Sequence, residues 1–149
     1  MNTITKPTEM TNNKQQTEMN KEFVPYELAL ELKQLGFDEP CLAFYDGKNA
    51  ESFYFNNIRD ASGDYIPFQK HDRLEWFGAP LYQQVFRWFR EKHNILGKVR
   101  NLNTHTIKHQ YYAEIVEPIT VSSYSIYDSY EEAELECLRK LIEVVKENL

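Results

Sequence analysis

The four histidines are the side chains of this sequence best suited to hold a metal ion or to transfer a proton: His71, His93, His105 and His109. His105 and His109 are four residues apart on a predicted strand and so share a face, and their β-branched and aromatic surroundings disfavour a helix. Their α-carbons would lie about 13 Å apart at ~3.3 Å per residue, which is too far for one metal ion. No cysteine or carboxylate joins them at the spacing of zinc ligands. The histidines therefore predict no metal site.

Carboxylates and nucleophiles form no recognisable catalytic pattern either. Asp60, Asp64 and Asp72 lie in an irregular stretch, and their spacing does not match a calcium-binding loop. The chain has no G-x-S-x-G motif, no P-loop and no paired-glycine cofactor loop. These absences predict a non-catalytic protein without a cofactor. A small enzyme whose site is assembled from residues 56–76 is the alternative.

One local excess of positive charge points to a partner. Between residues 87 and 109 six cations are opposed only by Glu91, so this segment carries +5 and the rest of the chain −11. A basic surface with nearby aromatic rings, among them Trp88, can hold phosphates and stack bases. The candidate partner-binding residues are these cations and the two tyrosines that follow them: Arg87, Arg90, Lys92, Lys98, Arg100, Lys108, Tyr111 and Tyr112.

Two simpler roles would account for the same positive charges. Either the cations pair with the acidic last helix, or they only solvate the surface. If the segment does bind a partner, that partner is either a protein or a nucleic acid. The net charge of −6 argues against general electrostatic binding of nucleic acid by the whole surface, but not against a local basic patch.

Length and composition fit one domain with a polar tail. The chain has 149 residues, of which 42% are hydrophobic, and this is enough for a core. Residues 1–20 are almost all polar and predict a disordered tail. Residues 21–149 predict a single α+β domain, with order beginning near Phe23.

The same composition indicates a soluble, cytoplasmic protein without a membrane partner. No apolar run of about 18 residues exists, and the first residues lack the apolar region of a secretory signal. Cys41 lies in an apolar run and Cys137 on a predicted helix. Both are predicted to be buried free thiols, as is usual in a reducing compartment.

Three helices are predicted from the spacing of apolar residues and from signals at the helix ends. Pro25 and Pro80 suit the first turns of two of them, and Gly36 suits the left-handed end of the first. Ser129 and Glu132 form a capping-box pair at the start of the last. The predicted helices span residues 25–35, 80–94 and 128–147.

Strands are predicted in two regions. The first region has two short strands, 40–45 and 52–55, around a turn, and the second has a hairpin of strands 105–116 and 121–127. The expected fold is α+β, with one small antiparallel sheet formed from residues 40–55 and 99–127. The helices at 80–94 and 128–147 cover this sheet, and the first helix packs at an edge.

Several segments are similar to a known family. They are residues 23–29 (FVPYELA), 35–41 (LGFDEPC), 79–92 (APLYQQVFRWFREK) and 129–142 (SYEEAELECLRKLI). Together they resemble a family of small proteins encoded by phages and prophages of the Bacteroidota. The resemblance covers most of residues 23–145 but not 46–75 or 95–127. It implies a phage or prophage origin and a bacterial cytoplasm, and it brings no functional residues.

The favoured function is therefore a non-catalytic interaction protein that binds a host protein or ribonucleoprotein. An inhibitor of host defence, such as an anti-CRISPR protein, is the sharpest form of this hypothesis, and it rests on the association with phages rather than on any residue. The acidic remainder of the surface would then mimic phosphate charge. An accessory protein that contacts RNA or DNA through residues 87–109 is the first alternative, and the small enzyme is the second.

Overall fold

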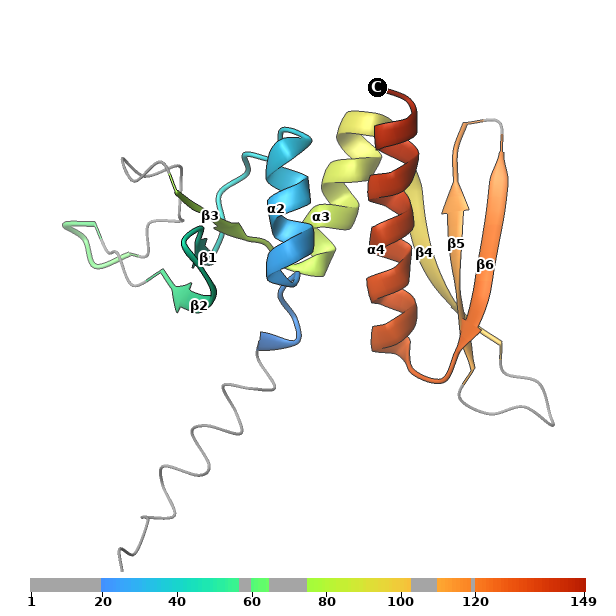
Figure 1. The fold of residues 1–149 in the computed structure, drawn as a ribbon, viewed down its shortest axis with the longest axis horizontal. Coiled ribbons are helices and arrows are strands. Elements are labelled where there is room, and N and C mark those ends of the chain that lie inside the picture. Colours follow the sequence, from blue (N-terminus) through green and yellow to red (C-terminus); the bar gives the residue numbers. More distant parts are fainter. Residues whose placement is uncertain (1–19, 57–59, 65–74, 103–109, 119) are drawn as a thin grey trace, which may run out of the picture.

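The chain forms two small sheets with a layer of helices between them. The computed structural model describes residues 20–56, 60–64, 75–102, 110–118 and 120–149. These residues form two three-stranded antiparallel sheets at opposite ends of the molecule, with the helices packed between them (Figure 1). The described part of the chain has no helix that is both long and apolar enough to cross a bilayer. The predicted tail lies almost entirely outside the described residues and stays a prediction.

The first sheet has the strand order β2-β1-β3, with β1 at Ala43–Asp46, β2 at Asn49–Phe55 and β3 at Trp76–Ala79. The predicted hairpin around the turn after Asp46 is confirmed, since β1 and β2 pair antiparallel. Strand β3 was not predicted, and it pairs with the other side of β1.

Helix α2, at Tyr26–Gln34, confirms the first predicted helix. Gly36 has φ of +91° and follows the helix as predicted. Its N–H donates to the Lys33 carbonyl, and the Phe37 N–H donates to the Leu32 carbonyl, which is the Schellman arrangement. The predicted place of this helix at a sheet edge is wrong. It lies between the first sheet and the last helix, because both of its sides bury apolar residues.

The second predicted helix is present but changes form in its last turn. Helix α3 spans Tyr82–Trp88 and continues as a π-helical turn, η1, at Phe89–His93. Asn94 then takes a left-handed conformation with φ of +56° and ends the helix. The wide turn places the His93 ring edge-on against Trp88, with centroids 4.7 Å apart.

The second sheet has the order β4-β5-β6. Its strands are β4 at Leu96–Asn101, β5 at Tyr111–Val116 and β6 at Val121–Tyr127. The predicted hairpin is confirmed, with Tyr111 opposite Tyr127. The first part of its predicted first strand, with two of the histidines, lies outside the described residues.

Helix α4, at Tyr130–Glu147, covers one face of this second sheet and also contacts α2 and α3. Six of its apolar side chains are buried at helical spacing, as predicted: Ala133, Cys137, Leu138, Leu141, Ile142 and Val145. Gly97 of β4 lies directly beneath them. A methyl group on Gly97 would come within 2.8 Å of Leu141 Cδ1 and 2.9 Å of Cys137 Sγ.

The prediction of one sheet is therefore wrong, although the α+β class is right. Residues 40–55 and 99–127 form separate sheets: β3 completes the first sheet beside β1, and the helical layer lies between this sheet and the second. Each sheet then buries one face against the helices, and a single continuous apolar core includes residues of both sheets, such as Tyr45 and Ile115.

The cap of α4 gives a first test of this fold. The Ser129 side chain accepts a hydrogen bond of 3.1 Å from the Glu132 N–H. We expect Ser129→Ala to lower the free energy of unfolding by about 1 kcal/mol, because that donor loses its partner. Ser129→Asp keeps an acceptor and should stay close to the wild type in urea unfolding. Equal losses in both variants would contradict the capping role.

The tight contact at Gly97 gives a second test. We expect Gly97→Ala to lower the free energy of unfolding by about 1–3 kcal/mol, because Leu141 and Cys137 must move apart to admit the methyl group. Asn101→Ala, at an exposed position of the same strand, should change it by less than about 0.5 kcal/mol. A neutral Gly97→Ala in chemical denaturation would show that α4 does not sit this close to β4.

Candidate functional site

A shallow groove of about 280 Å³ runs between α3 and the outer edge of β4. One wall comes from α3 and η1, the other from β4, and Tyr130 at the start of α4 lies at one side. The groove is lined by Gln83, Phe86, Arg90, Leu96, Gly97, Lys98, Val99, Arg100 and Tyr130. Three of the predicted partner-binding cations line this one groove: Arg90, Lys98 and Arg100.

The β4 side of this groove is a sheet edge with unused backbone groups. Among the described strands, β4 pairs with β5 alone, on one side. Just beyond the strand, the Leu102 N–H donates to the Gln110 carbonyl at 2.8 Å, and the register between β4 and β5 has no shift. Since hydrogen-bonded pairs alternate along an antiparallel ladder, Gly97, Val99 and Asn101 direct their N–H and C=O groups away from β5. Among the described residues these groups have no backbone partner.

Two of the predicted cations are neutralised by neighbouring carboxylates. Arg87 Nη2 lies 3.0 Å from Glu39 Oε2, and Arg100 Nε lies 3.1 Å from Glu114 Oε2. The alternative that this segment pairs with the last helix is thus wrong in its partners. Glu39 precedes β1 and Glu114 lies in β5, so neither partner belongs to the last helix.

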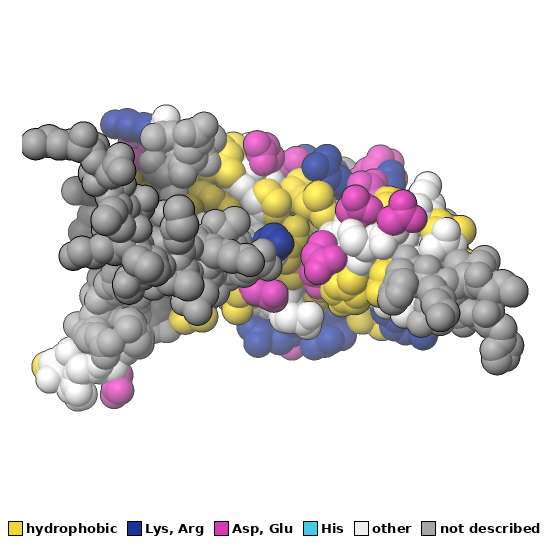
Figure 2. Space-filling model, turned by 90° about the horizontal axis from the view of Figure 1, so that it is seen from below, with side chains coloured by type: hydrophobic (Ala, Val, Ile, Leu, Met, Phe, Trp, Pro, Cys, Tyr) yellow, Lys and Arg dark blue, Asp and Glu magenta, His cyan; other side chains and the backbone are white. Residues whose placement is uncertain are grey.

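The other described cations of the segment have no ion pair to any described residue: Arg90, Lys92 and Lys98. Arg90 is on the α3 side of the groove and Lys98 on the β4 side. Figure 2 shows Lys and Arg side chains gathered along the lower margin of the central part of the molecule, with most Asp and Glu side chains above them. Of the three described cations of this segment without an ion pair, Arg90 and Lys98 therefore line the groove, and Lys92 lies on η1.

The aromatic candidates take positions that sequence reasoning did not foresee. Trp88 is buried in the core, so it cannot stack on a ligand. Tyr111 packs edge-on against Tyr130, with centroids 5.9 Å apart. Tyr112 lies opposite Arg100 and on the sheet face that α4 does not cover. Lys108 lies outside the described residues.

The sequence missed the uncharged lining of the groove. Phe86 could be found from its place on the widened apolar face of the second helix. Gln83 and Tyr130 carried no signal, since their role depends on how three elements meet. Gly97 contributes backbone, which no residue pattern marks as exposed.

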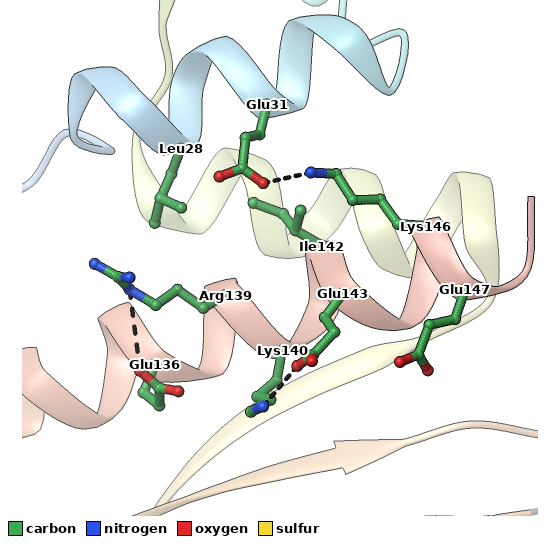
Figure 3. Close-up of a pocket in the computed structure, with 9 residues that line it drawn as sticks. All are labelled: Leu28, Glu31, Glu136, Arg139, Lys140, Ile142, Glu143, Lys146 and Glu147. Atoms are coloured by element: carbon green, nitrogen blue, oxygen red, sulfur yellow. Dashed lines mark hydrogen bonds and ion pairs between the residues drawn. The ribbon is translucent and has the colours of Figure 1, made fainter.

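A larger groove, of about 520 Å³, lies between α2 and α4. Figure 3 shows that charged side chains line most of it. Lys146 Nζ lies 2.7 Å from Glu31 Oε2 and joins the two helices, and Lys140 lies 2.6 Å from Glu143 within α4. Since these charges satisfy one another, this groove is better explained as a contact between helices than as a ligand site.

The two cysteines are held in an unreactive, protonated state. Both cysteines are buried free thiols, as predicted. Burial raises the pKa of Cys41 and of Cys137 to about 12, so both stay protonated at neutral pH. No group of three metal-ligating side chains occurs in the part of the chain that the structure describes.

Glu134 of α4 is the most perturbed described carboxyl. Burial, followed by repulsion from Glu22 and Glu131, raises its pKa from 4.5 to about 7. It lines neither of the two grooves. Its raised pKa therefore affects the stability of the fold, where α4 lies close to Glu22 in the chain before α2.

This carboxyl predicts a pH dependence. Between pH 4.5 and 7 the folded chain holds a proton that the unfolded chain releases, so the contribution of Glu134 to stability falls as the pH rises through that range. We expect Glu134→Gln to remove this fall and to stabilise the protein above pH 7 by on the order of 1 kcal/mol, reduced by solvent screening. Urea unfolding at several pH values measures it.

The control for this measurement is Glu147→Gln, at an exposed position near the other end of α4. It should leave the pH profile of the wild type unchanged. A Glu134→Gln profile parallel to the wild type between pH 4.5 and 7 would show that Glu134 titrates normally.

Comparison with known proteins adds no relative. No family model matches the chain, and neither a curated protein nor a solved structure matches it significantly. The resemblance to phage-encoded proteins thus stays a prediction, and function has to be inferred from the chain's own residues.

Proposed function

We propose that this chain is a non-catalytic interaction protein that binds an acidic segment of a partner protein in the groove between α3 and β4. The observation that carries the proposal is the pair of cations without an ion pair, Arg90 and Lys98, on the two sides of that groove. Both side chains line the same groove, so its charged groups are positive on both sides. An acidic segment lying in the groove would bring carboxylates to both cations.

The surroundings of these cations support a peptide as the ligand. Phe86 and Tyr130 give the groove an apolar wall, and Gln83 supplies an amide that both donates and accepts hydrogen bonds. Typical binding sites for protein segments combine such an apolar centre with a polar rim. The buried, protonated thiols and the position of Glu134 outside both grooves agree with a role without catalysis.

Nucleic acid is the second candidate, and one observation favours it. Lys98, Arg100 and Tyr112 share the face of the second sheet that no described helix covers. An open sheet face with a ring and cations is used by single-strand binding folds. Against it, the Arg100 charge is already paired with Glu114, and Tyr112 is one ring where such platforms stack several bases.

The further proposal that the partner is a bacterial host protein, and that binding inhibits host defence, is supported only by the family resemblance. The enzyme alternative depended on residues 56–76, most of which lie outside the described residues. Within that range, Asp60 accepts hydrogen bonds from the Ser62 and Asp64 N–H groups, which is an ordinary turn.

Binding measurements with two probes separate the candidates. The first probe is an octapeptide of alternating glutamate and valine, and the second is a single-stranded RNA of equal net charge. We expect the wild type to bind the peptide more tightly than the RNA in fluorescence anisotropy. Lys98→Glu should weaken peptide binding by about tenfold, because it reverses a groove charge.

Lys92→Glu is the matched control, since Lys92 carries the same charge on η1 but does not line the groove. It should change peptide affinity less than twofold. Equal weakening by both variants would show that the groove is not the site. Tight RNA binding with no peptide binding would replace this proposal with the nucleic-acid candidate.

A further inference from the structure

The edge of β4 differs from the other sheet edges in the described residues. The edges at β2 and β6 belong to ladders with a register shift, and β3 has only four residues. β4 has six residues, and its ladder with β5 runs without a shift. Natural proteins usually blunt exposed edges with bulges, short strands, charged side chains or covering elements. Within the described residues β4 has no bulge, carries the charged side chains of Lys98 and Arg100, and has α3 and η1 beside its edge across the groove, where its backbone groups stay unpaired.

The side chains beside this edge define what could pair with it. Lys98 and Arg100 lie on the face of the sheet away from α4, while Gly97 and Val99 lie on the face toward it. A strand added to β4 would continue this alternation, because successive side chains point to opposite faces. Its outward residues would lie beside Lys98, which has no ion pair, and beside Arg100, which is paired with Glu114. Its inward residues would lie beside Val99 and Phe86.

We infer that β4 takes up an extended segment of a partner protein as a fourth strand of the second sheet, and that acidic and apolar residues alternate in this segment. The backbone groups of Gly97, Val99 and Asn101 would provide the pairing, and the alternation would provide the specificity. This inference rests on the proposed function and adds the binding mode. Addition of a strand explains both the unused backbone groups and the charge of the groove.

A second copy of this chain fits the same edge less well. Pairing β4 with another β4 would bring the Lys98 side chains of the two copies, neither of which has an ion pair to a described residue, close to each other. Like charges directly opposite in a sheet are destabilising. The acidic partner has the complementary charge, so we favour it.

Backbone pairing is tested by methylating the peptide rather than the protein. The probe is the same octapeptide of alternating glutamate and valine, made in two further forms that carry N-methyl groups on all glutamates or on all valines. In an added strand one set of amides faces β4 and the other faces solvent. We expect one methylated form to lose at least about tenfold in affinity and the other to bind within about twofold of the parent.

The outcomes of the methylation test separate the inference from the proposed function. If the parent peptide and both methylated forms bind equally, strand addition is wrong, while peptide binding in the groove stands. If the parent peptide does not bind, the proposed function fails as well. If both methylated forms are weakened equally, the alternation of backbone contacts is contradicted.

Amide hydrogen exchange in the full-length chain locates the pairing. With saturating parent peptide, exchange at Gly97, Val99 and Asn101 should slow by at least about tenfold relative to the chain alone. The Lys98 and Arg100 amides, which already face β5, should change much less. Unchanged exchange at the first three residues despite bound peptide, or a stable dimer of the chain alone in sedimentation, would overturn the inference.

Discussion

The structure depends on a helical layer that must bury apolar surface on two sides at once. A three-stranded sheet cannot form a core alone, and here each sheet has one apolar face to cover. Phe89 and Leu138, both without solvent exposure, show how deep in this layer the side chains lie. Because α2 packs on the first sheet, α4 packs on the second, and α2 and α3 both contact α4, neither sheet can be removed without exposing helices that the other one needs.

The individual elements could largely be predicted because their ends carry chemical signals. Gly36 with its left-handed conformation, and Ser129 with its capping bond, end or begin helices where local chemistry requires it. The arrangement of the sheets could not be predicted in the same way. Strand β3 has four residues, one of them Gly78, and so lacks the length that makes an alternating pattern visible. Its pairing with β1 and the helical layer between the sheets could not be foreseen from local patterns, and together they give two sheets in place of the expected one.

The candidate site shows the same division between local and long-range information. A count of charges located the basic segment, but it could not tell which cations would stay unpaired. Arg87 meets Glu39 across 48 residues of sequence, and Arg100 meets Glu114 across a strand pair. After these pairings, the described cations of the segment without an ion pair are Arg90, Lys92 and Lys98, and two of them, Arg90 and Lys98, line the groove. The backbone of β4 has no sequence signature at all, since being an edge is a property of the whole sheet.

The π-helical turn η1 has a consequence for how this protein can vary. A π turn holds one more residue than the α-helical turn it replaces, so it is equivalent to a single-residue insertion in α3. The insertion rotates everything after it by about 100° around the helix axis. Arg90 lies within this turn, and β4 begins soon after Asn94 reverses the chain. Loss of one residue here would keep a helix and a strand, yet it would turn the cation of the helical wall away from the strand edge. In a comparison of variants of this chain, the length of the 89–94 segment would therefore say more about the groove than the identity of any surface residue.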